Sequence, residues 1–334
     1  MTNTTVSRPG ASRERRRRRQ ARTALVVIAV LAVAVVVAVL AVGTHVVGRT
    51  VRYPDVFGPI PESSRPAPAA DGAQTYLLVG TDDGSPVRAY FGSPIAGSTI
   101  QVVRLAPDGE SAQVVGISRD TPAPVEGGAG GTAPLGSALA TGGPTGLVRA
   151  VEGLTGVRVD HFATVDFPGF RGLVDRFGGI DVGVAAPTTG GAPLERMDGA
   201  QALAYLRAAD LPGGEASRVA REQNVLRGLL SGAAQASPLA LPGTVADLSH
   251  VVGFDDTMGV VSILRLGADL ATMRGEAITF VTAPIAGPGA PGDRGRPAQL
   301  LAPSASTLFT ALRDGRVGDW VAQNRPSQAV TAPR

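Results

Sequence analysis

The apolar and polar positions divide the chain into one long apolar run and a region of shorter, alternating segments. Residues 24–47, ALVVIAVLAVAVVVAVLAVGTHVV, contain no charged side chain unless His45 is protonated. This run exceeds the roughly 20 residues that a helix needs to cross a bilayer and the roughly 7–15 apolar residues of a cleavable signal. We therefore expect a transmembrane helix over residues 23–48 that remains as an anchor.

Arginines in front of this run predict its orientation. Residues 1–22 form a basic tail with eight arginines and a single acid, Glu14, and therefore carry +7. Positive charge on one side of an apolar span keeps that side in the cytoplasm. The sequence predicts a single-pass plasma-membrane protein with a cytoplasmic N-terminus and an extracytoplasmic C-terminal domain. The whole chain has a net charge of +3, which leaves −4 outside the tail, so nucleic acid is not an expected partner.

The rest of the chain alternates between strand-like and helix-like segments. Residues 49–73 are rich in proline and alanine, which is typical of a stiff, extended spacer. The candidate strands are 75–80, 99–105, 112–118, 160–167, 180–184 and 277–283, and the candidate helices are 144–156, 168–179, 198–207, 217–233 and parts of 240–273. This alternation predicts an α/β domain over residues 74–321, with helices on both faces of a central β-sheet. We expect loops at 126–143 and 286–297, which are rich in glycine and proline, and a disordered tail at 322–334.

Composition excludes several kinds of chemistry. The chain has no cysteine, and all of its 31 basic residues other than histidine are arginines. A phosphate-loop lysine, a lysine Schiff base, a thiolate nucleophile and a cysteine metal ligand are therefore absent. The three histidines lie far apart and show no metal-ligand spacing.

Arginines are the candidate anion ligands. Arg119 and Asp120 directly follow the candidate strand 112–118, where a surface turn with a salt bridge is the simplest explanation. Arg218 and Arg221 fall in the first turn of the helix predicted from Ser217, where the helix dipole disfavours a cation by about 0.3–1 kcal/mol. Either Arg218 pairs with Glu222 one turn later, or the arginines and the helix amides bind an anion such as phosphate. Arg207 ends the preceding candidate helix and is expected to converge on the same place.

Four segments taken together resemble a known family over nearly all of residues 74–285. They are YLLVGTDDG, STIQVVRLAPDGESAQVVGISRDT, GGPTGLVRAVEGLTGVRVDHFATVDFPGFRGLVDRFGGIDVGV and RMDGAQALAYLRAADLPGGEASRVAREQNVLRGLL. Their order and spacing resemble the LytR-CpsA-Psr family. The resemblance implies a helix-flanked sheet that holds a polyprenyl-pyrophosphate-linked glycan, and transfer of the phosphoglycan to a peptidoglycan hydroxyl.

The resemblance also implies roles for individual residues. The positions that match the family's charged motifs are Asp82, Arg119, Asp120, Arg207, Arg218 and Arg221. The implied Mg²⁺ site would use Asp82, with Asp83 and Ser98 as further ligands, because Ser98 stands where the family has an aspartate. If a polyprenyl chain is held beside Arg119, the implied apolar walls include Phe167, Phe170 and Leu206, although these residues would serve equally well as ordinary core.

Three functions of different class follow. In the first, the arginines stabilise the transferring phosphoryl group and Asp82 orients the metal or the acceptor. In the second, the protein has kept the lipid-phosphate pocket but lost the chemistry, and it acts as a scaffold or regulator of envelope assembly. A serine hydrolase is the weakest, because GISRD lacks the second glycine of G-x-S-x-G.

Overall fold

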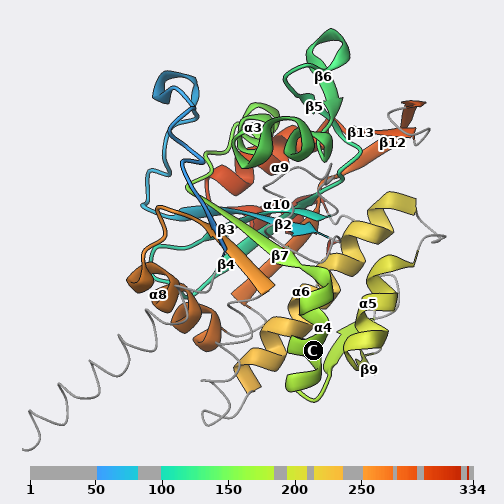
Figure 1. The fold of residues 1–334 in the computed structure, drawn as a ribbon. Coiled ribbons are helices and arrows are strands. Elements are labelled where there is room, and N and C mark those ends of the chain that lie inside the picture. Colours follow the sequence, from blue (N-terminus) through green and yellow to red (C-terminus); the bar gives the residue numbers. More distant parts are fainter. Residues whose placement is uncertain are drawn as a thin grey trace, which may run out of the picture. The chain divides into compact units, whose positions relative to one another are not determined.

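A mixed sheet forms the centre of the domain. The computed structural model describes residues 51–81, 99–183, 194–208, 214–235, 251–273, 277–291, 297–324 and 329–330. The strands of the sheet are β1 (Val51–Tyr53), β2 (Gln74–Thr81), β3 (Thr99–Leu105), β4 (Ala112–Ile117), β7 (His161–Asp166), β10 (Val252–Asp255), β11 (Ile278–Thr282) and β14 (Ala329–Val330). Within the described residues they lie in the order β1-β10-β7-β2-β3-β4-β11-β14 (Figure 1).

Four central strands run in the same direction. Strand β2 is parallel to β7, and β4 is parallel to β11, while β3 lies antiparallel between β2 and β4. Strands β2, β4, β7 and β11 therefore all stop at one end of the sheet, which we call the carboxyl end. There, Thr81 at the end of β2 is in register with Asp166 at the end of β7.

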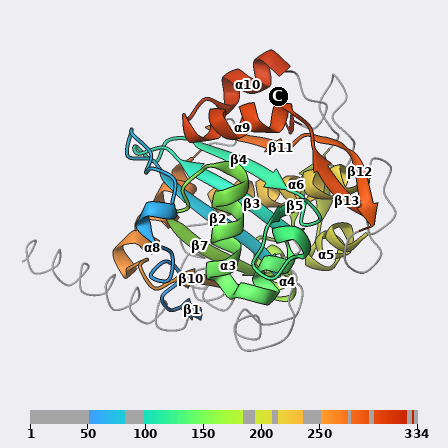
Figure 2. The ribbon, with the colours of Figure 1, turned by 90° about the horizontal axis from the view of Figure 1, so that it is seen from above.

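Helices cover both faces of this sheet. One face carries α3 (Ser137–Thr155), α9 (Ser304–Arg313) and α10 (Val317–Asn324), and the other carries α4 (Phe167–Arg176), α5 (Gly199–Arg207), α6 (Gly214–Gln235) and α8 (Val260–Thr272) (Figures 1 and 2). The alternation along β2 explains this division, because Leu77 and Val79 pack in the cluster with α3 and α9, whereas Tyr76 packs in the cluster with α6 and α8. The expected α/β fold with a helix-flanked central sheet is confirmed.

Three hairpins and two short 3-10 helices complete the described domain. The hairpins pair β5 (Pro122–Pro124) with β6 (Thr132–Pro134), β8 (Ile180–Gly183) with β9 (Leu194–Met197), and β12 (Ile285–Pro291) with β13 (Pro297–Leu301), and the 3-10 helices are η1 (Glu62–Ser64) and η2 (Ala129–Gly131). The loops expected at 126–143 and 286–297 are thus partly regular structure. Strand β6 and the start of α3 fall in the first loop, and parts of β12 and β13 fall in the second.

The described part of the expected spacer belongs to the folded domain. Val51 pairs with Gly253 in the sheet, and Tyr53 is 1% exposed. The Tyr53 ring packs edge-on against Phe162 at 5.3 Å between centroids, and its hydroxyl lies 2.9 Å from Thr164 Oγ1. Residues 51–60 are therefore not a free spacer, because their apolar side chains complete the core that faces α3.

The C-terminal end is likewise more ordered than expected in its described part. Residues 322–324 end α10, and β14 pairs with β11. The basic tail at 1–22 and the expected span over 23–48 lie outside the described residues. None of the helices in the described ranges is both long enough and apolar enough to span a bilayer.

Candidate functional site

The charged residues of GISRDT form a tight turn at the carboxyl end of the sheet. The Asp120 amide donates to Ser118 Oγ at 3.1 Å, and the Thr121 amide donates to the Ser118 carbonyl at 3.1 Å. The carbonyl of Arg119 accepts from the amide of Gly136, directly before α3, at 2.8 Å. Arg119 therefore follows β4 on a backbone that is fixed on two sides, which differs from a loose surface turn.

Arg218 is held between two carboxylates of its own helix. Its Nη1 lies 2.6 Å from Glu222 Oε1, its Nε lies 2.9 Å from Glu215 Oε2, and Nη2 contacts the other oxygen of Glu215. The Ser118 hydroxyl donates to Glu215 Oε1 at 3.0 Å. The pairing of Arg218 with Glu222 that the sequence suggested is present, and Glu215 connects α6 to the turn after β4.

These contacts shift the proton affinity of both partners. Burial raises the pKa of Glu215, but hydrogen bonds from Arg218 and Ser118 and the charges of Arg218 and Arg119 hold it below its usual value. Burial lowers the pKa of Arg218, but Glu215, Glu222 and the charge of Asp120 more than offset this effect. The pKa of Arg218 is therefore raised above its usual value, and Arg218 stays charged. We call Arg119, Asp120, Glu215, Arg218 and Glu222 the charged cluster.

Arg221 binds the neighbouring helix. Its Nη1 donates to the carbonyl of Tyr205 at 2.8 Å, and its guanidinium lies 4.6 Å from the centre of the Tyr205 ring. The Tyr205 hydroxyl in turn donates to the carbonyl of Gly183 at 3.1 Å. Arg221 therefore fixes the carboxyl end of α5, where Arg207 is the last residue and is exposed.

A buried pair of amide side chains joins α6 to the sheet beside the charged cluster. Gln223 Nε2 donates to the carbonyl of Val281 at 3.0 Å and to Gln101 Oε1 at 3.1 Å. Both glutamines are at most 1% exposed. Gly116 of β4 lies against this pair and lacks the Cβ that would collide with Val219 Cγ1 at 2.4 Å. These contacts hold α6 close to the sheet and so fix Arg218 relative to Ser118.

An incompletely covered apolar strip lies on the same face of the sheet. The side chains of Leu78, Val103 and Val165 point toward the α6 side and are partly exposed, although Val103 packs against the cluster of α6 and α8 and Val165 against the cluster of α4 and α5. On the opposite face, Leu77 and Val79 are fully buried. A central strand covered by helices normally buries both of its faces. The three half-buried side chains, which we call the apolar strip, therefore form a candidate surface for an apolar ligand.

Two of the three expected cleft walls lie in an apolar cluster. Phe170 is 2% exposed and Leu206 is 9% exposed, and both pack with Val174 and Ile180. This position fits the alternative that they are ordinary core, and their role as cleft walls stays a prediction. Phe167 begins α4, and its side chain lies outside the description.

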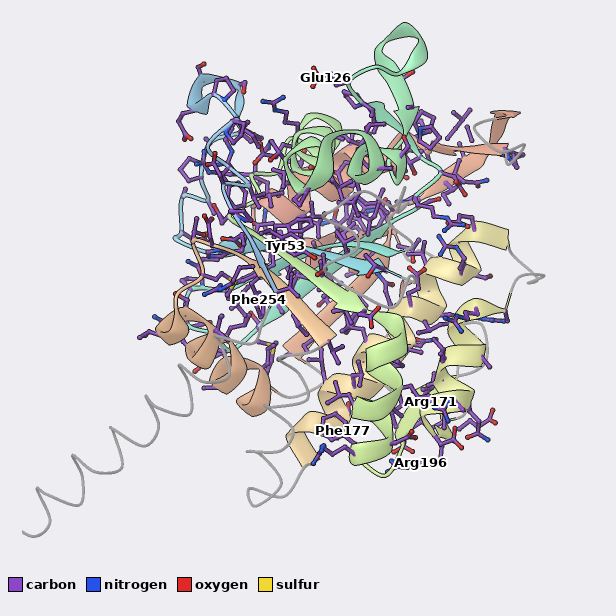
Figure 3. The ribbon with its side chains drawn as sticks, viewed as in Figure 1. Tyr53, Glu126, Arg171, Phe177, Arg196 and Phe254 are labelled. Atoms are coloured by element: carbon purple, nitrogen blue, oxygen red, sulfur yellow. The ribbon has the colours of Figure 1, made fainter. Side chains whose placement is uncertain are left out.

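A cavity of about 210 Å³ is lined by residues that include Phe177, Asp181 and Arg196. Figure 3 shows Phe177 and Arg196 at the end of the α4 and β9 region that lies away from the sheet. Arg196 pairs there with Asp181 at 3.2 Å. This cavity is separate from the charged cluster.

The residues expected to form a metal site lie outside the part of the chain that the structure describes. Asp82, Asp83 and Ser98 are not among the described residues. Within the described ranges, no group of three histidine, aspartate or glutamate side chains is arranged to hold a metal ion. Mg²⁺ therefore stays a prediction.

One acidic contact and one aromatic contact of the site were not expected from the sequence. Glu215 precedes Arg218 by three residues, and that spacing is a usable signal for an ion pair on one helix face. Tyr205 lies 16 positions before Arg221, and no local pattern indicates that contact. The structure brings together Arg119, Asp120 and Arg218 and assigns Arg221 to the contact between α5 and α6.

Fold and site together define a class of protein, a helix-flanked α/β domain with a charged site at the ends of parallel strands. Comparison with known sequences is more specific. The sequence model of the LytR_cpsA_psr family matches residues 59–298, and the chain belongs to this family.

Curated relatives support this assignment. The chain is 30% identical over 277 residues to the cell wall biosynthesis protein LcpA of Corynebacterium glutamicum, a match that covers 68% of this chain and 53% of LcpA. It is 26% identical over 185 residues to TagV of Bacillus subtilis, a polyisoprenyl-teichoic acid–peptidoglycan teichoic acid transferase, with 51% of this chain and 46% of TagV covered. The chain thus spans about half the length of these two relatives.

Solved structures share the fold. The LytR-Csp2A-Psr enzyme from Actinomyces oris superposes with a TM-score of 0.59 at 21% identity, covering 79% of this chain and 95% of that one. The crystal structure of B. subtilis TagV gives 0.58 at 21% identity, covering 74% and 97%.

Proposed function

We propose that the protein is a membrane-anchored phosphotransferase that moves a phosphoglycan from a polyprenyl-pyrophosphate carrier to a hydroxyl of peptidoglycan. The observation that carries this proposal is the position of Arg119, whose backbone is fixed at the carboxyl end of the sheet and whose charge acts on Glu215 of α6, the helix on the side of the apolar strip. A guanidinium suits phosphate oxygens, and an apolar strip suits a lipid chain. TagV, a polyisoprenyl-teichoic acid–peptidoglycan teichoic acid transferase, has an activity of the same class.

The reaction assigns simple tasks to the chain's own residues. The acceptor hydroxyl oxygen forms a new bond to the glycan-bearing phosphorus, and the bridging P–O bond of the pyrophosphate breaks. The products are a glycan phosphodiester and polyprenyl phosphate, and the hydroxyl proton passes to a base or to water. Arg119 stabilises the negative charge of the transferring phosphoryl group, and exposed Arg207 is the next candidate for binding the glycan phosphate. Asp82, Asp83 and Ser98 would hold Mg²⁺, which would offset negative charge on the pyrophosphate.

Transfer is tested with the full chain in detergent micelles, a polyprenyl-pyrophosphate-linked disaccharide, Mg²⁺ and peptidoglycan fragments. Released polyprenyl phosphate is measured. Arg119→Ala should lower the rate at least about a hundredfold, because a transition-state donor of this kind contributes roughly 3 kcal/mol. Arg313→Ala removes an exposed arginine at the end of α9 and is the matched control. Equal rates for Arg119→Ala and the wild type would eliminate Arg119 from the mechanism.

A non-catalytic lipid-binding scaffold is the second candidate. It is favoured by Arg218 and Arg221, both of which contact protein groups in the described structure. Asp82→Ala separates the two candidates, because it should abolish transfer in an enzyme and leave lipid binding intact in a scaffold. Lipid binding without any release of polyprenyl phosphate by the wild type would favour the scaffold.

We also propose that residues 24–47 span the plasma membrane and anchor the C-terminal domain on its extracytoplasmic side. The chain has no cysteine, so one introduced thiol reports its own side of the membrane. Ser63→Cys, at an exposed position of η1, should react with a membrane-impermeant maleimide in intact spheroplasts. Ser7→Cys in the basic tail should react only after lysis, and the reverse pattern would contradict the topology.

A further inference from the structure

The cavity beside α6 and the hairpin of β8 and β9 is a second place where a ligand fits. Its lining includes the ring of Phe177, the ion pair of Arg196 and Asp181, and the hydroxyl of Ser231 (Figure 3). Gly228 and Gly232 of α6 also line it. A Cβ at Gly228 would lie 2.8 Å from the carbonyl oxygen of Asp181, so glycine lets α6 approach β8 closely at this wall.

The polar groups of this lining keep hydrogen-bonding capacity for a ligand. Arg196 Nη1 donates to Asp181 Oδ2 at 3.2 Å, and Arg196 Nη2 donates to the carbonyl of Gly178 at 3.2 Å. Among the residues that the structure describes, Asp181 Oδ1 and the Ser231 hydroxyl have no hydrogen-bond partner. The side chains of Arg196 and Asp181 are 55% and 44% exposed, so a ligand that enters from solvent can reach both.

The chemistry of the lining selects the class of ligand. The charges of Arg196 and Asp181 cancel, so a phosphate group gains little net attraction here. A lipid chain is disfavoured, because it would desolvate the ion pair and the hydroxyl of Ser231 without hydrogen-bonding to them. A sugar ring fits better, since its hydroxyls can donate to a carboxylate and accept from a guanidinium, and an aromatic side chain offers apolar surface to one face of the ring. The volume of about 210 Å³ is below the roughly 300–1,000 Å³ of pockets for drug-sized ligands and suits a single ring.

We propose that this cavity is a carbohydrate subsite that binds one ring of a neutral glycan. Asp181 accepts hydrogen bonds from sugar hydroxyls, Arg196 donates to sugar oxygens, and Ser231 does both. Ser231 follows Arg218 on α6 by 13 residues, which is about 20 Å at 1.5 Å per residue. The subsite therefore holds a ring some distance along the glycan from a phosphate at the charged cluster. The inference rests on the proposed function for the source of the glycan, which is either the carried polymer or the peptidoglycan strand.

The test measures glycan binding to the full chain in micelles of a detergent without a sugar headgroup, because such a headgroup would compete. Chitotetraose and cellotetraose are titrated separately, without lipid or metal, and binding is followed by saturation-transfer difference NMR. Asp181→Asn and Arg196→Gln should each weaken binding about tenfold, because each removes a charged hydrogen-bond partner of the sugar. Asp314→Asn is the matched control, since Asp314 pairs with Arg316 at 2.9 Å in another exposed ion pair directly after α9. It should leave both affinities unchanged.

Gly232→Ala tests the shape of the cavity and leaves every polar group in place. The added Cβ would lie 3.3 Å from Phe177 Cδ2 and narrow the cavity, so glycan binding should weaken. Urea denaturation of each variant shows whether it is folded. Failure of the wild type to bind either glycan would overturn the proposal, and so would wild-type affinity in the folded Asp181→Asn and Arg196→Gln variants.

The two glycans distinguish the sources, because they differ in the acetamido groups that peptidoglycan carries. Tighter binding of chitotetraose supports a subsite for the peptidoglycan strand, and equal binding of both supports a subsite for the carried polymer. The binding assay is independent of transfer. Transfer by a wild type that binds neither glycan contradicts the subsite alone, whereas glycan binding without transfer supports the subsite and contradicts the proposed enzyme.

Discussion

Gly116 of β4 lies against α6 and leaves no room for a Cβ, so its substitution tests the packing of α6 on the sheet. A Cβ at Gly116 would lie 2.4 Å from Val219 Cγ1 and 2.8 Å from both Gln101 Oε1 and Gln223 Nε2. All three neighbours are at most 1% exposed and cannot move into solvent. Gly116→Ala therefore has to push α6 away from β4 or break the buried amide pair.

Two costs add up in this variant. Overpacking a buried site typically costs about 1–3 kcal/mol, and a buried amide that loses its partner costs about 1–3 kcal/mol. We expect the free energy of unfolding to fall by about 2–4 kcal/mol, a large part of the roughly 5–15 kcal/mol of an ordinary domain. The chain contains one tryptophan, and Trp320 is 6% exposed, so its fluorescence during urea denaturation reports unfolding.

A second glycine provides the control. Gly267 lies inside α8 with no atom within 4 Å of the position of a Cβ. Gly267→Ala should raise the free energy of unfolding by roughly 0.5–1 kcal/mol, because alanine favours the helix. If Gly116→Ala unfolds at the same urea concentration as the wild type, the close packing of α6 on β4 is refuted.

The remaining predictions concern buried charges and use the same urea assay. Glu152→Ala should cost about 3 kcal/mol, because it leaves the Arg65 guanidinium, whose side chain is 7% exposed, without its carboxylate. Burial raises the pKa of Asp255, but hydrogen bonds, led by the one from His161, hold it below its usual value; its stabilisation should therefore be lost as the pH falls below roughly 4, and Asp255→Asn should flatten that loss. Burial raises the pKa of Tyr76 to about 12, so the free energy of unfolding should fall as the pH rises above roughly 10, with Tyr76→Phe as the control.

The central strands could be predicted from sequence because their apolar runs are local signals. Expected strands 75–80, 99–105 and 277–283 correspond within two residues to β2, β3 and β11. Strand β1 could not be predicted, since three residues that pair with β10 about two hundred positions later carry no local pattern. The hairpin of β12 and β13 was hidden in a segment rich in glycine and proline, where composition indicates a loop.

The site was predictable in its residue types and only partly in its contacts. A one-turn spacing sufficed to propose the pair of Arg218 and Glu222, because helix geometry places such residues on one face. The link from Ser118 to Glu215 joins positions 97 apart, and only the packing of α6 on the sheet creates it. The sequence therefore predicts which charged residues belong to the site. Which of them pair with each other and which contact a ligand depends on tertiary packing.

The charged cluster and the apolar strip are best understood together. Leaving Leu78, Val103 and Val165 half-buried forgoes about 25 cal/mol for each Å² that a helix would have covered. In the charged cluster, Arg218 is matched by the carboxylates of Glu215 and Glu222, so an anion alone gains little from Arg218. In the proposed function, a ligand with a lipid chain and a phosphate group gains affinity from the apolar strip as well as from the guanidinium of Arg119. Such a site would discriminate against free phosphate without any residue that recognises the lipid headgroup by shape.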